Sequence, residues 1–214
     1  MSRPTEQPAA PSSPAVTNPA AANPEEAAEG TQLQFQVVLY PEPVLRQPAE
    51  DVAIDEDLKR LVAAMYRCMH ASNGVGLAAP QVGLKKRVLV LNPLGKEGGP
   101  EDDLTLVNPR IVGFAGARST YEEGCLSFPG IYAEVLRPER CTVEALDVDG
   151  KPIRAEYDGF VSRIIQHEYD HLEGVLLVDR MSPADRQRHK AALEDLKHGY
   201  REAKEKRKRA AELA

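Results

Sequence analysis

The chain lacks long hydrophobic runs. No stretch approaches the roughly 18 apolar residues of a membrane-spanning helix or the about 7 to 15 of a secretory signal. A transit peptide for mitochondria or chloroplasts would be poor in acidic residues, yet the first thirty residues include Glu6, Glu25, Glu26 and Glu29. From these absences we expect a cytoplasmic protein without a membrane partner.

Cysteine is scarce as well. Cys68, Cys125 and Cys141 are odd in number, lie far apart and form no Cys-x-x-Cys pair. This pattern excludes the disulfide framework of a small secreted domain and fits a reducing compartment. A special role for any of the three has to be argued from its own surroundings.

The first 31 residues contain no aromatic side chain, but they contain six prolines and eight alanines. So little apolar surface cannot offset the entropy that is lost when the backbone becomes ordered. We therefore predict a disordered tail over residues 1–31, followed by a single folded domain.

Charge is unevenly distributed along the chain. The net charge is -6, yet residues 186–209 contain ten Lys or Arg and four Asp or Glu, a local charge of +6. Clustered cations of this kind bind a polyanion without sequence preference. A solvated charged helix has the same composition, so charge alone leaves both interpretations open.

Hydrophobic periodicity and capping signals predict three helices. Residues 55–72 have apolar residues at helical spacing after Asp55, a typical N-cap, and residues 160–174 have the same spacing before a terminal glycine. Ser182, followed by Pro183, opens a third helix in which apolar positions become sparse.

Between the first two helices, short segments predict strands at residues 87–92, 104–114, 131–136, 141–147 and 152–157. The Asp149-Gly150 pair is a hairpin turn signal between the last two strands. Because no βαβ alternation is present, we expect an α+β fold of short antiparallel strands around a central helix, with a further helix at the C-terminus.

His167 and His171 lie four residues apart on the helix expected at residues 160–174, so their rings project from one face and can bind one metal ion. Glu168 follows the first histidine. Its carboxylate can reach a metal-activated water without binding the ion, as in hydrolases with a His-Glu-x-x-His motif. The pattern indicates a catalytic metal centre.

Such a centre needs a third protein ligand and one position left for water. The extended motif His-x-x-Gly-x-x-His is excluded because residue 177 is Leu177. Glu194 would be the ligand in a zinc endopeptidase of the thermolysin type, although it lies in the charged helix. Cys125, in the glycine-containing loop at residues 123–130, is the other candidate. The loop alone leaves the role of this cysteine open.

Three segments occur in a fixed order along the chain. They are Gly74-Val-Gly-Leu-Ala-Ala-Pro-Gln81, Glu123-Gly-Cys-Leu-Ser127 and Gln166-His-Glu-Tyr-Asp-His-Leu-Glu-Gly174. Together they closely resemble the motifs of the peptide deformylase family, and the resemblance covers roughly residues 35–182. It implies a hydrolase that removes the formyl group from the N-terminal formylmethionine of nascent polypeptides and releases formate.

The resemblance also implies a ligand set. Cys125, His167 and His171 would bind one ion per chain, with water in the fourth place. A Cys/His₂ site favours Zn²⁺ by ligand type, but the family typically works with Fe²⁺, which we therefore expect here, with Zn²⁺, Ni²⁺ or Co²⁺ as substitutes. An iron–thiolate centre would be sensitive to oxygen.

Further roles follow from the same resemblance. Glu168 is the implied proton carrier. The Gln81 side-chain amide and the Leu126 backbone N–H are the two implied oxyanion donors. The implied substrate contacts are Gly76, Gly124 and Arg137. The glycines would let the substrate backbone lie against the protein as an added strand. For Arg137, a surface salt bridge is an equally good explanation.

The expected organisation is a deformylase catalytic domain at residues 32–182 and a basic C-terminal helix at residues 183–214. Its segment Lys204–Arg209 could tether the protein to ribosomal RNA through phosphate contacts, without sequence-specific nucleic-acid recognition. Two other functions are consistent with parts of the pattern: a zinc endopeptidase that uses Glu194, and a metal-stabilised ribosome-binding module with a closed site.

Overall fold

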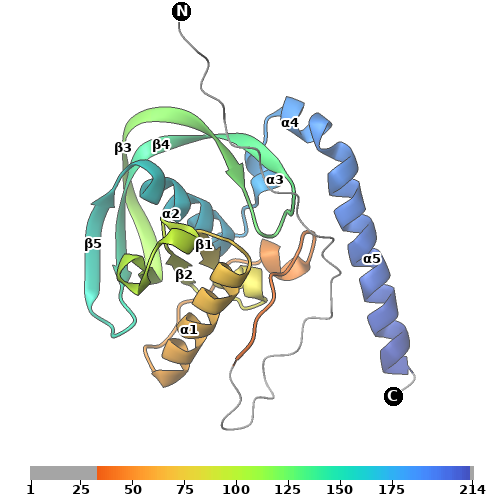
Figure 1. The fold of residues 1–214 in the computed structure, drawn as a ribbon, viewed down its shortest axis with the longest axis horizontal. Coiled ribbons are helices and arrows are strands. Elements are labelled where there is room, and N and C mark those ends of the chain that lie inside the picture. Colours follow the sequence, from red (N-terminus) through yellow and green to blue (C-terminus); the bar gives the residue numbers. More distant parts are fainter. Residues whose placement is uncertain (1–32, 213–214) are drawn as a thin grey trace, which may run out of the picture.

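The computed structural model of the chain describes residues 33–212, so the tail predicted at residues 1–31 lies outside the described residues. Figure 1 shows curved strands, helices on both sides of them, and a last helix, α5, along one side of the molecule. The described strands form one sheet in the order β1-β2-β3-β4-β5, and each neighbouring pair is antiparallel. The fold is therefore α+β, as expected.

The strands are β1 (Gly76–Ala78), β2 (Val88–Leu91), β3 (Leu104–Gly124), β4 (Tyr132–Leu146) and β5 (Pro152–Tyr157). The helices are α1 (Glu56–Ala71), α2 (Gly159–Leu172), α3 (Leu177–Arg180), α4 (Pro183–Arg188) and α5 (Lys190–Glu212). Short 3₁₀ turns occur at η1 (Pro43–Arg46), η2 (Ala79–Val82), η3 (Gly95–Glu97) and η4 (Pro100–Asp102).

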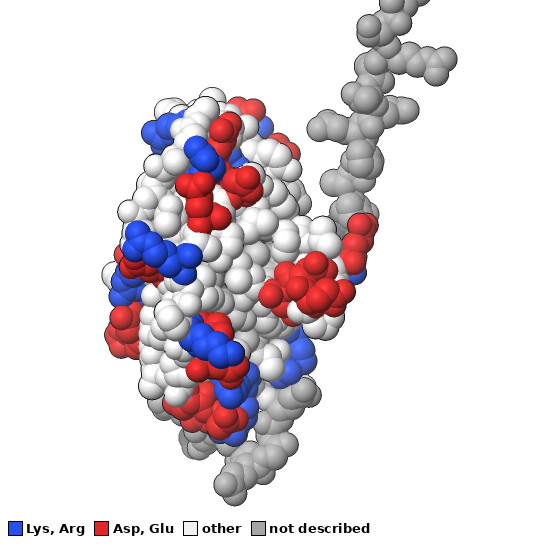
Figure 2. Space-filling model, turned by 90° about the vertical axis from the view of Figure 1, so that its left-hand side faces the viewer, with Lys and Arg blue, Asp and Glu red and all other residues white. Residues whose placement is uncertain are grey.

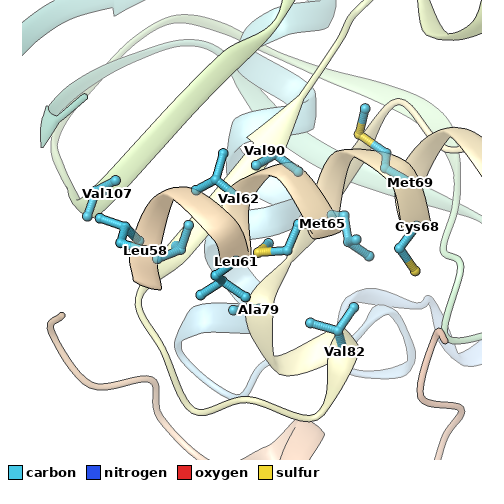
Figure 3. Packing of buried hydrophobic residues seen from close by; sticks show 12 residues of the cluster. Leu58, Leu61, Val62, Met65, Cys68, Met69, Ala79, Val82, Val90 and Val107 are labelled. Carbon is cyan, nitrogen blue, oxygen red and sulfur yellow. The ribbon is translucent and has the colours of Figure 1, made fainter. Parts of the chain in front are cut away.

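Helix α1 begins where its sequence signals predict. The Asp55 side chain accepts a hydrogen bond of 2.8 Å from the Leu58 backbone N–H and so satisfies one of the free donors of the first turn. The apolar stripe of the helix is buried against the sheet and η2, as Figure 3 shows for Met65, Val62 and their neighbours. Each fully buried side chain of this size contributes about 1.5–3 kcal/mol.

Strand β2 explains how two helices share one sheet. Its sequence Val-Leu-Val-Leu has no polar alternation, and all four side chains are buried. Val88 and Val90 pack in the cluster that contains α1, whereas Leu89 and Leu91 pack in the cluster that contains α2. Because successive side chains of a strand point to opposite faces, α1 and α2 cover opposite faces of the sheet here.

The prediction of short strands was wrong for the middle of the chain. Strand β3 continues from residue 104 to Gly124, and β4 joins the two strands that we expected at residues 131–136 and 141–147. The Asn108-Pro109 interruption is absorbed as a register shift between Val107 and Arg110, where Asn108 adopts a φ of 51°. A bulge bends a strand without ending it, so local turn residues misled the prediction.

Helix α2 agrees with the periodicity of residues 160–174, within two residues at each end. It packs against β1, β2 and β4. After it, the Ser182 side chain caps α4 by accepting a 3.0 Å hydrogen bond from the Asp185 N–H, as predicted, and Pro183 opens the helix. Helix α4 ends at His189 and the chain continues as α5, so the single C-terminal helix expected from residue 183 onward is two helices in the described structure.

Helix α5 is held mainly through its first half. Leu193 is buried, Leu196 and Tyr200 are partly buried, and most of the residues after them are exposed. The sparse apolar positions of this segment therefore correspond to a helix whose second half is largely exposed. Among residues 33–212, no helix combines the length and the apolar character needed to cross a membrane.

Candidate metal centre

Three side chains from two distant stretches converge at one point. His167 and His171 project from the same face of α2, with ring centroids 5.3 Å apart. Cys125 follows the end of β3, and its Sγ lies 3.2 Å from Nε2 of His171. The nearest ligand atoms of the three residues all lie within 4.8 Å of one another. The thiol of residue 125 therefore does meet the two imidazoles.

The spacing suits a cation. Metal–sulfur and metal–nitrogen bonds of about 2.3 and 2.0 Å at a tetrahedral angle put the ligand atoms roughly 3.5 Å apart. The 3.2 Å between Cys125 Sγ and His171 Nε2, and the upper limit of 4.8 Å for all the pairs, are compatible with that value. A thiolate and two imidazoles are also ligands that first-row transition metals accept. The residues present therefore fit a single transition-metal ion.

The orientation of His167 is set by Glu123. The Nδ1–H group of His167 donates a 3.0 Å hydrogen bond to the Glu123 carboxylate, which leaves Nε2 for the cluster. Burial alone would raise the pKa of Glu123, but hydrogen bonds from His167 and Arg137 outweigh it and lower the pKa to about 2. The carboxylate is therefore charged and accepts hydrogen bonds only.

The two histidines differ in their electrostatic surroundings. Burial, followed by the charge of His167, lowers the pKa of His171 well below its ordinary value, so this ring is neutral and can bind a metal. Burial acts in the same direction on His167, but its hydrogen bonds to Cys125 and Glu123 outweigh burial and raise its pKa. A cation that binds here must displace the proton from that ring.

Glu168 is buried beside the cluster, 4% exposed, and burial raises its pKa to about 7. Its Oε2 atom has no hydrogen-bond partner among the described residues. A carboxyl group with a pKa near neutrality can both accept and return a proton, which is what a general acid and base requires. An unpartnered oxygen is available for a water molecule or a substrate.

The sulfur atom of Cys125 also faces an amide. Gln81, 1% exposed in η2, is held by the Ala78 N–H, which donates to Gln81 Oε1 at 2.8 Å. Its Nε2 group then points to Cys125 Sγ at 3.6 Å and to Ser127 Oγ at 3.4 Å. The structure thus brings Gln81 to the cluster with its donor directed toward Cys125. Leu126, the other expected donor, follows Cys125 directly in the sequence.

The two glycines expected to contact substrate lie where a neighbouring side chain leaves no room for a Cβ atom. A Cβ atom at Gly76 would lie 2.6 Å from Oε1 of Glu168, and one at Gly124 would lie 2.8 Å from the Tyr132 ring. Gly76 belongs to β1, which pairs with β2 on one side only, because β1 ends the described sheet. Its other edge pairs with no strand among the described residues.

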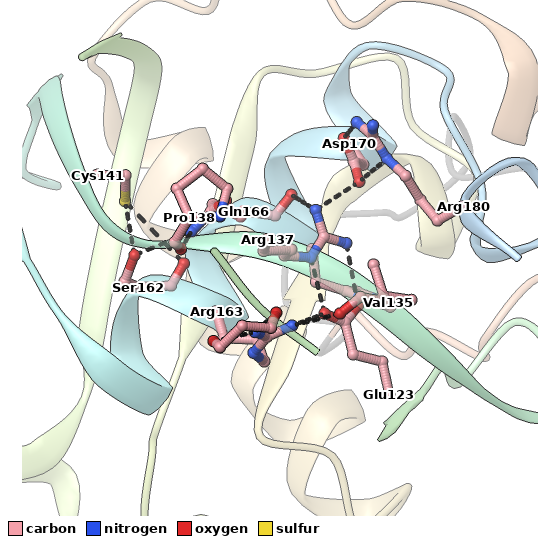
Figure 4. Close-up of polar contacts among 12 residues, drawn as sticks. Glu123, Val135, Arg137, Pro138, Cys141, Ser162, Arg163, Gln166, Asp170 and Arg180 are labelled. Carbon is pink, nitrogen blue, oxygen red and sulfur yellow. Dashed lines mark hydrogen bonds and ion pairs between the residues drawn. The ribbon is translucent and has the colours of Figure 1, made fainter. Parts of the chain in front are cut away.

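Arg137 is in a buried ionic network, and not in a surface salt bridge. Its guanidinium, 5% exposed, donates to Glu123 at 2.7 and 3.0 Å and to Asp170 at 2.9 Å. Asp170 in turn accepts from Arg180. Figure 4 shows this row of alternating charges and, on the other side of Glu123, a second guanidinium from Arg163.

Glu194 is not part of the cluster. It lies on α5, its side chain is 54% exposed, and it pairs with Lys197 at 2.8 Å. Together with Arg46 and Lys190 it lines a separate pocket of about 290 Å³ beside the N-terminal part of α5. In the described structure the third residue beside the two histidines is Cys125.

The sequence patterns did not assign roles to the residues that surround the ligands. Glu123 lies in the second of the three motifs, and Arg163 lies among hydrophobic residues of α2, so neither is distinguished by local sequence as a partner of a metal ligand. One signal was present: Arg163 lies four residues before His167, so a charged side chain on the same buried stripe of the helix needs a partner.

Comparison with known families and proteins gives a consistent result. A family model described as polypeptide deformylase matches residues 34–187. The chain is 43% identical to peptide deformylase 1B, chloroplastic/mitochondrial, of Arabidopsis thaliana over 183 residues, which are 83% of this chain and 67% of that protein. It is 46% identical to the peptide deformylase of Rhizobium meliloti (strain 1021) over 151 residues, 70% of this chain and 86% of that protein.

Solved structures agree with the sequence comparisons. A crystal structure of peptide deformylase from Plasmodium falciparum superposes with a TM-score of 0.76 at 39% identity and covers 77% of this chain and 96% of its own. A structure of Arabidopsis thaliana peptide deformylase 1B in complex with an inhibitor gives a TM-score of 0.75 at 43% identity, with 79% and 93% coverage.

Proposed function

The chain belongs to the polypeptide deformylase family, and we infer that it removes the formyl group from the N-terminal formylmethionine of nascent polypeptides, releasing formate. It is thus a hydrolase of a linear amide bond that acts in protein biosynthesis. The observation that carries this function is the convergence of Cys125, His167 and His171 beside the buried carboxyl group of Glu168.

A direct assay tests the function. Protein purified without oxygen and analysed for metal is incubated with a formyl-Met peptide and, separately, with the unformylated peptide. We expect formate from the first only. Cleavage of internal peptide bonds without formate would instead favour the zinc endopeptidase.

We propose that Cys125, His167 and His171 hold one ion, and that the ion is Fe²⁺, with Zn²⁺, Ni²⁺ or Co²⁺ as substitutes. Two observations support the site: the ligand spacing and the orientation of His167 by Glu123. A divalent cation held there would act as a Lewis acid that polarises water and the formyl carbonyl. Metal analysis of protein isolated without oxygen tests the choice of iron.

Proton transfer is assigned to Glu168. Its carboxylate takes a proton from the attacking water as the new carbon–oxygen bond forms at the formyl carbon. It then gives that proton to the amide nitrogen as the carbon–nitrogen bond breaks, so that formate and a free amine leave. The pKa of about 7 supports both halves of this cycle at neutral pH.

Two donors are proposed for the negative charge that develops on the formyl oxygen. They are the Gln81 side-chain amide and the Leu126 backbone N–H. The inward direction of Gln81 Nε2, fixed by its bond with Ala78, supports the first. Removing a donor of this type typically costs about 2.7–4 kcal/mol of transition-state stabilisation.

The substrate backbone is proposed to lie along the free edge of β1, at Gly76, and beside Gly124 at the end of β3. Main-chain hydrogen bonds of an added strand do not depend on side chains, so one site can serve many nascent chains. Arg137, which we also expected near the substrate, donates its hydrogen bonds to Glu123 and Asp170. Its proposed contribution is therefore to hold Glu123, which lies next to Gly124, in a fixed position.

Gly76→Ala tests the close approach of β1 to the catalytic carboxyl group of Glu168. The new methyl group would overlap Glu168 Oε1, and a displacement of about 1 Å at a catalytic group can cost on the order of 100-fold. We expect kcat/KM for a formyl-Met peptide to fall by about that factor. Gly199→Ala, where the methyl group meets no atom within 4 Å, is the control and should have unchanged kinetics. Equal kinetics for both variants would contradict the assignment.

We propose the division into a catalytic domain at residues 32–182 and a basic C-terminal segment at residues 183–214, which contains α4 and α5 and binds ribosomal RNA. The exposed lysines and arginines of the second half of α5 support this partner. Figure 2 shows the side of the molecule that lies opposite α5 in Figure 1, and there basic and acidic groups are interspersed. The excess of positive charge belongs to α5.

Replacing Lys204, Lys206 and Lys208 by alanine should weaken ribosome binding. Each phosphate contact contributes about 0.7–0.9 to the slope of log affinity against log salt, so the magnitude of the slope should fall by roughly 2 to 3. Three exposed lysines on the body, Lys86, Lys96 and Lys151, provide the matched control. A chain that ends near residue 185 and binds ribosomes as well as the full chain would refute the tether.

The cytoplasm is proposed as the compartment. Three free cysteines support a reducing environment. Two plant relatives have organellar names, so fractionation of the source cells is the test. Recovery of the protein in an organelle fraction would overturn this proposal.

A further inference from the structure

One buried cation has no role in the chemistry described so far. Arg163, on α2, is 8% exposed although arginine is rarely buried without partners. We propose that Arg163 is a positioning residue, which acts through Glu123 to hold the metal-binding ring of His167 and which ties the strand that leads to Cys125 onto α2. This inference rests on the proposed metal site.

The spacing along α2 places Arg163 in line with the ligands. Residues 163, 167 and 171 are four apart, so they form one stripe on the helix, with Arg163 one turn before His167. Arg163 and His167 both reach Glu123: Nη1 of Arg163 donates to Oε1 at 2.8 Å, and Nδ1 of His167 donates to Oε2 at 3.0 Å. One carboxylate therefore links two successive turns of the helix.

Glu123 is saturated by these contacts. Its Oε1 atom accepts from Arg163 Nη1 and from Arg137 Nε, and its Oε2 atom accepts from His167 Nδ1 and Arg137 Nη2. Because each oxygen accepts two hydrogen bonds, the carboxylate is not free to rotate about its Cγ–Cδ bond. The direction in which His167 donates, and hence the direction of its Nε2 lone pair, is set by this arrangement.

The other donors of Arg163 anchor it to the β3–β4 ribbon. Nη2 donates to the Ser119 backbone oxygen at 2.9 Å and to Ser119 Oγ at 3.1 Å, and Nη1 donates to the Val135 oxygen at 3.1 Å. Its guanidinium carbon lies 5.5 Å from the centre of the Tyr121 ring. Arg163 thus contacts both strands, just before β3 leads into the Cys125 loop.

Arg137 does not duplicate this function. It connects Glu123 to Asp170 and the Gln166 oxygen, which lie on the C-terminal half of α2, whereas Arg163 connects Glu123 to Ser119 and Val135 on the strands (Figure 4). Loss of Arg163 would leave the Glu123 carboxylate held from one side. The planar fork of arginine is needed, because a lysine ammonium cannot serve a carboxylate and two carbonyls in this geometry.

The test measures metal binding, not turnover. Co²⁺ is titrated into the metal-free full chain, and the affinity and the visible absorption spectrum of bound Co²⁺ are recorded. For Arg163→Met and for Arg163→Lys we expect affinity 10–100-fold weaker than wild type, the range for residues that orient a metal ligand, together with an altered spectrum. Arg140→Met removes an exposed arginine that pairs with Glu156, and it should bind Co²⁺ as the wild type does.

A double variant separates positioning from general loosening. Because Arg163 acts on the His167 ring through Glu123, Arg163→Met should weaken Co²⁺ binding by a much smaller factor in a Glu123→Gln background than in the wild-type chain. Additive losses, or wild-type affinity and spectrum in Arg163→Lys, would overturn the proposal. Failure of the wild-type chain to bind Co²⁺ would instead refute the metal site itself, so the two failures are distinguishable.

Discussion

Replacing Glu168 by glutamine is expected to lower kcat for a formyl-Met peptide by about 10²–10⁴-fold, the usual contribution of a positioned proton carrier. The substitution keeps the shape of the side chain but removes its ability to accept a proton. Because Glu168 is not among the three converging ligand residues, the variant should keep its metal ion. Steady-state kinetics and metal analysis of the same sample measure both properties.

Glu144→Gln is the matched control for this experiment. Glu144 is a partly exposed carboxylate on β4 that pairs with Arg154 and is not part of the cluster, so its replacement should leave kcat unchanged. A Glu168→Gln protein that retained its metal and kept kcat within tenfold of wild type would remove Glu168 from the mechanism. A closed-site binding module would release no formate even as the wild-type chain, so the wild-type assay decides between an enzyme and a binding protein.

Replacing Cys125 by alanine should abolish both metal binding and formate release. The thiolate supplies one of three protein ligands, so its loss should exceed the 10–100-fold effect of a residue that only orients a ligand, and we expect metal affinity to fall by more than about 100-fold. Turnover should fall below detection, because the cation that polarises the formyl group is then absent. Metal content after dialysis and the formate assay measure the two effects.

Cys68→Ala is the corresponding control. Cys68 is buried in the core formed with α1 and is not one of the three converging residues, so its replacement should affect stability slightly and leave metal content intact. The endopeptidase alternative forecasts the reverse outcome, in which Cys125→Ala stays active and Glu194→Ala does not. The exposure of Glu194 and its pairing with Lys197 argue against that outcome.

Some of the site could be predicted from the sequence because its geometry depends on residues that lie within one or two helical turns of each other. The alignment of His167 and His171 on one face follows from helix geometry alone, and the cap at Asp55 follows from hydrogen bonding within one turn. Where the order was not local the prediction was less accurate. Asn108-Pro109 suggested an interruption, but the pairing of β3 with β4 carried the strand through as a bulge.

The sequence by itself determined which side chains are chemically suited to the site and how the two histidines are spaced, because a helix repeats within four residues whatever surrounds it. Only the tertiary structure decided that Cys125 meets them, that Glu123 orients His167, and that Arg137 and Arg163 are buried beside it. These contacts join residues separated by roughly 40 positions, and they depend on how the β3–β4 ribbon packs on α2. No short-range pattern encodes that packing.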